Sequence, residues 1–249
     1  MVGTFINFAT VMVGGIFGLL IGQRLPDRIK HIVIAGLGLI TIVLGVSNAI
    51  KTENALIPLL ALVIGSVIGE LIDIDSGINH LGDWLKQRFD RPGSQQNFTL
   101  AFVLASLQFC VGPLTIIGSL NDGLSHDFSL LAIKAVLDGF SAIIFASTFG
   151  IGTLFAGATI LVIQGGISLL AGLLKPLLVT VPNASMGSQP RIIELGAVGG
   201  VILIGLALNI LDIKRIKIAN MLPALIIAPL IVVLLNTWGI PLDFGLGGH

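Results

Sequence analysis

The sequence predicts an all-α, polytopic membrane protein, and composition and segment length are the two observations behind that prediction. Of the 249 residues, 55% are hydrophobic and 10% are charged, and the mean hydropathy is +1.04. Soluble domains carry roughly 25% charged residues, so this chain could not cover a soluble surface. About eight apolar segments are long enough to cross a hydrocarbon layer of roughly 30 Å.

The expected helices follow one another closely along a single transmembrane domain that covers residues 1–249. The predicted spans are Val2–Gln23, Ile32–Ala49, Ala55–Ile74, Phe98–Leu120, Phe128–Gly150, Gly152–Leu174, Ile192–Leu211 and Ala219–Trp238. Between spans three and four, Ser76–Arg91 places Ile78, Leu81, Leu85 and Phe89 on one helical stripe. That pattern predicts a short helix in the headgroup region, and an ordinary soluble loop helix is the alternative.

The positions of the cations predict the orientation of the spans. Nine of the 13 Lys and Arg residues follow spans one, three and seven, three lie in the opposite loops, and Lys134 lies inside a span. Cytoplasmic loops carry the excess of positive charge. We therefore expect both termini to lie outside.

A weak internal repeat relates spans one to three (1–75) to spans six to eight (150–238). At an offset of 149 residues, Gly3-Thr4 matches Gly152-Thr153, and Ala9-Thr10 matches Ala158-Thr159. The two triplets would start on opposite sides of the membrane, and inverted repeats of this kind are common in transporters. Spans four and five would then form a central pair. Chance similarity between apolar sequences is the alternative.

Glycines recur every four residues on two spans, at Gly14, Gly18 and Gly22 and again at Gly65 and Gly69. Rows of small residues allow close helix approach inside a bilayer. We expect them to serve packing within the chain, and a homo-oligomer through these faces is the alternative.

The central stretch 108–148 contains the residues that a plain anchor does not need. Lys134 and Asp138 are one turn apart in an apolar span, so they can form a structural pair. Alternatively, Asp138 faces a water-filled path and binds a cation or a proton, because carboxylates within a membrane are candidates for function.

Gly112-Pro113 predicts a kink or a break in span four, since proline removes a backbone donor. A simple change of shape is one reading. In the other, the freed carbonyls near Phe109 and Cys110 bind a cation. Asp122 falls in an outer turn that is most simply a solvated loop, and a mouth that concentrates cations is the alternative. The candidate substrate or ion site comprises Gln108, Cys110, Gly112, Pro113, Thr115, Asp122, Lys134 and Asp138.

Other chemistry is not indicated. One cysteine and four scattered histidines provide no metal-ligand spacing, and no nucleophile with its base or phosphate loop is recognisable. We therefore expect neither an enzyme nor a cofactor. With 13 acidic and 13 basic residues, no charge excess points to nucleic acid. Asn7 and Gln164 should bond between helices, whereas Glu70 and Glu194, near span ends, should face solvent.

The opening GTFINFATVMVGGIFGLLIGQRLP and the central CVGPLTIIGSLNDGLSHDFSLLAIKAVLDGFSAIIFASTFGIG resemble the bacterial domain-of-unknown-function 554 family over essentially the whole chain. The resemblance implies a multi-pass protein of the bacterial inner membrane. It implies no activity, substrate or cofactor.

Two functions follow from these observations. The first is a small-solute or ion transporter with a mid-membrane site on spans four and five. The second is a membrane scaffold or regulator that acts through the charged face of helix 76–91. A pseudo-symmetric structure with a polar cavity reaching Asp138 would favour transport, and a dry core with Lys134 bonded to Asp138 would favour the scaffold.

Overall fold

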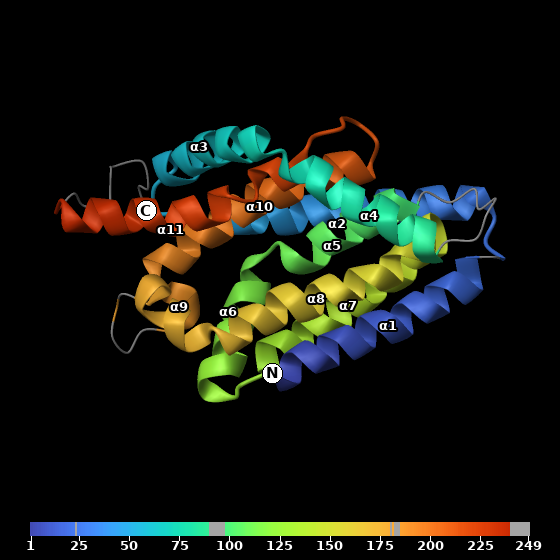
Figure 1. Ribbon diagram of the computed structural model, residues 1–249, viewed down its shortest axis with the longest axis horizontal. Coiled ribbons are helices and arrows are strands. Elements are labelled where there is room, and N and C mark those ends of the chain that lie inside the picture. Colours follow the sequence, from blue (N-terminus) through green and yellow to red (C-terminus); the bar gives the residue numbers. More distant parts are fainter. Residues whose placement is uncertain (23, 90–97, 180, 182–184, 240–249) are drawn as a thin grey trace.

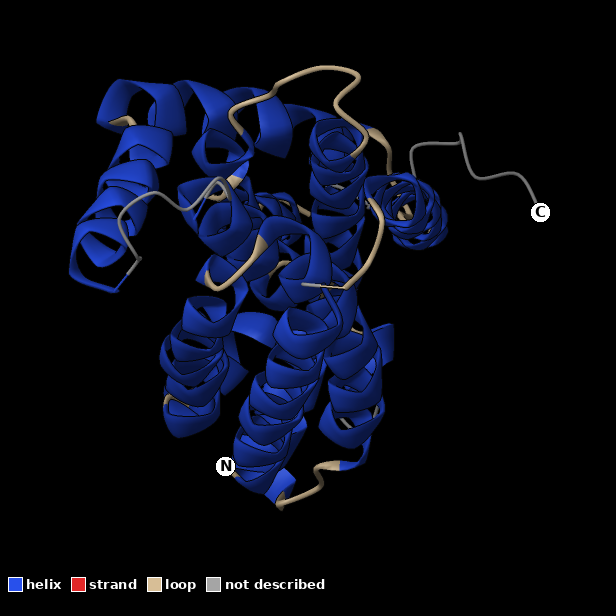
Figure 2. Ribbon diagram, turned by 90° about the vertical axis from the view of Figure 1, so that its right-hand side faces the viewer, coloured by secondary structure: helices blue, strands red, loops and turns tan. Residues whose placement is uncertain are grey.

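The computed structural model describes residues 1–22, 24–89, 98–179, 181 and 185–239, and the regular structure within them is helical (Figures 1 and 2). The α-helices are α1 Val2–Gly22, α2 Asp27–Ala49, α3 Leu56–Ile72, α4 Ile74–Phe89, α5 Phe98–Cys110, α6 Pro113–Ser125, α7 Ser129–Phe149, α8 Gly152–Leu169, α9 Ala171–Leu178, α10 Pro190–Ile210 and α11 Ala224–Thr237. Two short 3₁₀ helices, η1 Met186–Ser188 and η2 Ile218–Met221, precede α10 and α11.

The expected polytopic helical architecture is confirmed, and two pairs of helices are sharply bent. Among the described residues, six helical segments are long and apolar enough to cross a membrane, and eight spans result if the pairs α3–α4 and α5–α6 each count as one. The predicted ends at Gln23 and Arg91 lie outside the described residues.

The first bend corrects the boundary between span three and the helix after it. Asp73 adopts a left-handed conformation (φ 54°, ψ 54°), and α4 leaves the α3 axis by 52°. The predicted helix therefore begins at Ile74 rather than Ser76. Gly82 lets α4 approach Thr99 and Phe102 of α5 closely. A position in the headgroup region stays a prediction.

The second bend divides span four, which is not the straight helix Phe98–Leu120. α5 ends at Cys110, α6 begins at Pro113, and their axes differ by 60°. Span six is also shorter than expected, because α8 ends at Leu169 and α9 starts at Ala171. The break at Gly112-Pro113 is the one that the sequence predicted.

The helices form two groups with α5 between them. In Figure 1, α1, α7 and α8 run side by side in the lower half, and α2, α3, α10 and α11 lie in the upper half. α5 contacts α4, α7, α8 and α10. Phe98, Phe102 and Phe109 of α5 are among the largest fully buried side chains. The break at the end of α5 therefore lies in the interior.

The glycine rows hold neighbouring helices at short distance within the chain. Methyl groups added at Gly14, Gly18 and Gly22 would collide with backbone carbonyls of α7, and those at Gly65 and Gly69 with backbone atoms of Ala224 and Asn220. These faces are therefore occupied by the chain's own helices. A homo-oligomer stays a prediction, and with this packing it would use another face.

Glu70 and Glu194 lie in different environments. The Glu70 side chain is 58% exposed, as expected, and its hydrogen bond with Lys217 raises the pKa of that ammonium group. The expectation that Glu194 faces solvent is wrong, since the residue is 1% exposed. The loop between α2 and α3 folds over it and supplies hydrogen bonds from Thr52 and from the backbone N–H of Glu53.

Candidate functional site

The site begins at the break between α5 and α6, because the proline leaves one backbone carbonyl without its helical partner. The carbonyl of Phe109 would accept a hydrogen bond from the N–H of residue 113 in a continuous helix, and Pro113 has none. Gly112 takes φ 157° and ψ 150°, a region that glycine alone adopts readily. The free carbonyl is buried with its residue, which is 0% exposed.

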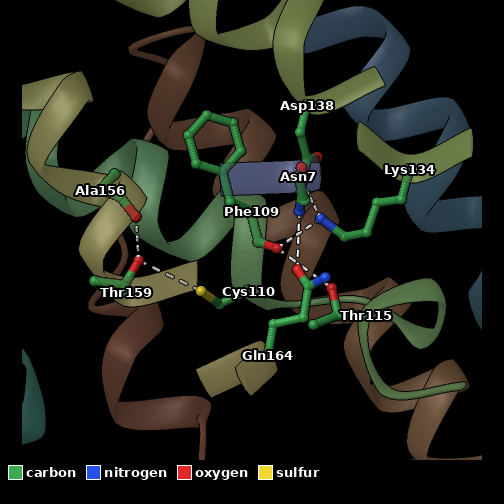
Figure 3. Close-up of polar contacts among 9 residues, drawn as sticks. All are labelled: Asn7, Phe109, Cys110, Thr115, Lys134, Asp138, Ala156, Thr159 and Gln164. Atoms are coloured by element: carbon green, nitrogen blue, oxygen red, sulfur yellow. Dashed lines mark hydrogen bonds and ion pairs between the residues drawn. The ribbon is translucent and has the colours of Figure 1, made fainter. Parts of the chain in front are cut away.

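The side chain of Lys134, on α7, binds that carbonyl (Figure 3). Its Nζ donates to the Phe109 carbonyl oxygen at 2.7 Å and forms an ion pair with Asp138, one turn further along α7. Lys134 is 5% exposed and Asp138 is 6% exposed. The cation that binds the freed carbonyl is thus the protein's own ammonium group.

Two amide side chains from other helices complete the cluster. Asn7 of α1 donates through Nδ2 to Asp138 Oδ2 at 2.9 Å and to Gln164 Oε1 of α8 at 2.9 Å. Both residues are 0% exposed. Asn7 Oδ1 and Gln164 Nε2 have no hydrogen-bond partner in the described part of the chain. The cluster joins α1, α5, α7 and α8, and it keeps unused hydrogen-bonding capacity.

The structure brings together only some of the predicted site residues. Thr115 Oγ1 lies 3.3 Å from the Phe109 carbonyl oxygen and donates to it. The thiol of Cys110 points elsewhere, toward Thr159 Oγ1 at 3.4 Å, and lines an apolar cavity of about 810 Å³. Among the described residues, no hydrogen bond joins Gln108 or Cys110 to the Lys134–Asp138 pair.

Asp122 is placed differently from the prediction. The expected solvated turn is helical at this point, because α6 continues to Ser125, and Asp122 is 1% exposed. Its Oδ2 lies 3.0 Å from the N-terminal nitrogen of Met1. The exposed turn contains Asp127 instead, where hydrogen bonds from Ser129 hold the pKa of the carboxyl below its usual value.

A row of phenyl rings leads from Phe109 to a second cavity. This cavity, of about 620 Å³, has the polar lining residues His31, Asp75, Asn79, Asn209, Asp212 and Arg215. Phe149 also lines it, and the rings of Phe149 and Phe145 are 5.7 Å apart. The Phe145 ring meets that of Phe109 edge-on at 6.3 Å. These three rings, named here the aromatic seal, form a row of contacts from the polar cavity to Phe109, whose carbonyl binds Lys134.

Sequence reasoning expected hydrogen bonds from Asn7 and Gln164 but did not assign them to the site. The available signal was spacing: Thr4 and Asn7, Ser119 and Asp122, and Gln164 and Ser168 are each three or four residues apart in apolar helices. Such pairs share one helix face. Which faces meet depends on tertiary packing.

Known proteins are similar to this chain over most of its length. A family model described as "Protein of unknown function (DUF554)" matches residues 2–233. "Uncharacterized protein YqgA" of Escherichia coli K12 is 33% identical over 230 residues, which cover 91% of this chain and 94% of the relative. "Uncharacterized membrane protein YdfK" of Bacillus subtilis 168 is 29% identical over 245 residues, covering 96% and 99%. No solved structure matches the chain significantly.

Proposed function

Because the chain belongs to the DUF554 family, whose function is unknown, its role has to be inferred from its own site, and we propose that this membrane protein transports a small solute or ion. The working site would be the cluster of Lys134, Asp138, Asn7 and Gln164 at the α5–α6 break. Helix breaks with free backbone groups near mid-membrane are typical of substrate and ion sites in transporters.

The observation that carries the proposal is the setting of the ion pair. Lys134 and Asp138 are bonded to each other, which the structural alternative also requires. A purely structural pair has little to gain in an apolar interior, because apolar groups of similar size usually stabilise as well. Here Lys134 also binds the Phe109 carbonyl, and Asp138 accepts from Asn7. Asn7 and its partner Gln164 each keep one polar atom without a hydrogen-bond partner among the described residues. Such a cluster can exchange its internal bonds for bonds to a ligand.

The two sides of the cluster support alternating access. On one side the polar cavity ends at the aromatic seal of Phe109, Phe145 and Phe149. On the other, buried polar side chains continue along α1, α6 and α8 as far as Asp122. A transporter requires both routes, with at most one open at a time, and on this proposal the aromatic seal closes one of them.

Helix packing supports the inverted repeat. α1 packs on α8, α2 on α10 and α3 on α11, and in Figure 1 the members of each pair run in opposite directions. These are the pairs that the sequence repeat relates. An axis in the membrane plane that passes between all three pairs would account for the arrangement, with α5, α6 and α7 in the centre.

The second candidate function is a scaffold that acts through α4. It is favoured by the ion pair itself and by the exposed side chains of α4, where Trp84 is 60% exposed and Leu81 is 48% exposed. On that reading the chain binds a partner at Lys86 and Arg88, and no solute crosses the membrane.

A flux screen in proteoliposomes separates the two functions. Simple cations, anions and metabolites would be tested against the parent and against the double variant Lys134→Met/Asp138→Asn, which removes both charges and keeps the helices. We expect one solute class to be taken up by the parent alone. Equal uptake by parent and double variant for every solute would favour the scaffold.

We also propose placement in the bacterial inner membrane with both termini outside, on the strength of the cation distribution. Single cysteines at Lys30, Arg88 and Lys214, in a Cys110→Ser background, should react only with a reagent on the cytoplasmic side. Labelling of any one of them from outside would overturn this orientation.

A further inference from the structure

Six buried polar side chains connect the ion pair with the end of the bundle where α1 begins. This polar column comprises Thr4 and Asn7 of α1, Ser119 and Asp122 of α6, and Gln164 and Ser168 of α8. None of them is more than 4% exposed. Asn7 links Asp138 with Gln164, Ser168 donates to the Ser119 carbonyl at 3.0 Å, and Asp122 pairs with the Met1 nitrogen.

The column holds more hydrogen-bonding groups than the chain satisfies. Thr4 Oγ1, Asn7 Oδ1, Ser119 Oγ, Asp122 Oδ1 and Gln164 Nε2 have no hydrogen-bond partner among the described residues. Buried polar atoms in proteins nearly always have a partner, because an unmet donor or acceptor is costly. Where such atoms gather at neighbouring positions, bound water ordinarily supplies the missing bonds. Five such atoms in one column indicate a chain of water molecules.

The charges of the column restrict what the water could carry. Two carboxylates, Asp122 and Asp138, face two ammonium groups, those of Met1 and Lys134, so the formal charge is zero. A neutral column does not concentrate metal cations or anions. Hydroxyl and amide groups both donate and accept, so they can support a hydrogen-bonded water chain between the two carboxylates. Such a chain passes protons.

We propose that the polar column is a water-filled proton path that connects Asp138 with the surface near Asp122. The inference deepens the proposed function, because it names the proton as the coupling ion of the same site. Its hydration can be tested without any transported solute, so the two proposals can fail separately.

Hydration is tested with adjacent cysteines. Ser119→Cys and Leu120→Cys, each in a Cys110→Ser background, place thiols at neighbouring positions that are both 0% exposed. Protein in lipid nanodiscs would be treated with 2-aminoethyl methanethiosulfonate and followed by intact mass. We expect the thiol at 119 to react at least about tenfold faster, since apolar surroundings disfavour the reactive thiolate and exclude the reagent. Equal protection of the two thiols would overturn the water path.

Proton conduction is tested with the aromatic seal opened. In a Phe145→Ala background, proton entry into pyranine-loaded liposomes would be driven by a potassium diffusion potential. Adding Asp122→Asn should slow entry by about tenfold, as expected for a missing relay group, whereas Asp127→Asn, in the exposed turn, should not. Should Asp122→Asn fail to fold, Ser119→Ala tests the same path and should also slow entry.

The combined outcomes are distinct. The thiol at 119 could react while proton entry is unchanged by Asp122→Asn and Ser119→Ala, or while no protons enter in the Phe145→Ala background. Either result overturns the proton assignment and leaves a hydrated column. A reactive thiol and slowed proton entry, with no solute moved in the flux screen, leaves the column established and refutes solute transport.

Discussion

Two buried carboxylates, Asp138 on α7 and Glu194 on α10, are stabilised in different ways. Glu194 is 1% exposed and accepts hydrogen bonds from neutral donors: Thr52 Oγ1 at 2.6 Å and the backbone N–H of Glu53 at 2.9 Å. Asp138 is 6% exposed and accepts from the Lys134 ammonium and from Asn7. Both lie in apolar helices, so burial alone does not distinguish them.

The difference lies in what surrounds each group. The donors of Glu194 come from one loop. Their hydrogen bonds hold that loop against the start of α10, and this structural role accounts for the carboxylate. The donors of Asp138 are Lys134 of α7 and Asn7 of α1. Asn7 and the Gln164 side chain that accepts from it each retain an atom without a hydrogen-bond partner among the described residues. A carboxylate whose neighbours have all their hydrogen-bonding atoms paired holds a fixed structure. A carboxylate whose neighbours have unpaired hydrogen-bonding atoms can exchange partners, as a transport cycle requires.

The largest effect is expected from breaking the ion pair. Asp138→Asn leaves a buried ammonium group without its carboxylate, so the free energy of unfolding should fall by about 3–5 kcal/mol. The double variant Lys134→Met/Asp138→Asn should recover most of that stability. Transport should be lost in both. Thermal unfolding in detergent and liposome flux measure the two properties, and a double variant that still transports like the parent would show that the pair is structural only.

The aromatic seal offers the next largest effect. Phe145→Ala removes a buried ring that contacts Phe109 and Phe149, which should cost about 3–5 kcal/mol of stability and open the polar cavity toward Asp138. A reporter thiol from Ala142→Cys in a Cys110→Ser background should then react faster with a water-soluble reagent. Phe140→Ala on the same helix is the control, because Phe140 is 64% exposed. Equal reactivity in both backgrounds would contradict a seal at Phe145.

Much of the fold follows from local patterns. Apolar length predicts the spans, and Gly112-Pro113 predicts the break, since proline removes a donor wherever the helix happens to lie. The same chemistry predicts free carbonyls near Phe109, and in the structure the Phe109 carbonyl accepts a hydrogen bond from Lys134. Lys134 and Asp138 are neighbours on one helix, so their pairing also depends only on local spacing.

The misplaced residues are those whose environment depends on distant segments. Asp122 and Glu194 lie near span ends, where solvent is the usual neighbour, yet α6 extends past the expected turn and the loop 50–54 folds over Glu194. Asn7 and Asp138 are 131 residues apart, and no period in the sequence relates them. The amide half of the site could therefore not be predicted from single helices.

Removing one donor from each carboxylate sharpens the contrast. Asn7→Leu deletes a donor to Asp138, and Thr52→Val deletes a donor to Glu194. A hydrogen bond to a charged group contributes about 1.5–3 kcal/mol, so thermal unfolding should show similar losses in both variants. Only Asn7→Leu should reduce flux, because only Asp138 is proposed to exchange partners. Loss of flux in Thr52→Val would remove the distinction between the two sites.

The smallest effect is expected where a charge is removed but every hydrogen bond can be kept. In Glu194→Gln, the amide oxygen can still accept from the N–H groups of Glu53 and Asn54, which lie 2.9 and 3.4 Å from Oε1. The amide nitrogen can donate to Thr52 Oγ1, because a hydroxyl also accepts. Stability should therefore change by less than about 1 kcal/mol.

Flux in Glu194→Gln should equal that of the parent, since the proposed role of Glu194 is to hold the loop and needs no charge. The same conservative change at Asp138 abolishes flux if its charge serves transport. A Glu194→Gln protein that unfolds at the parent's temperature but no longer transports would place Glu194 on the transport route. A buried carboxylate with all its hydrogen bonds made could then not be assumed to be structural.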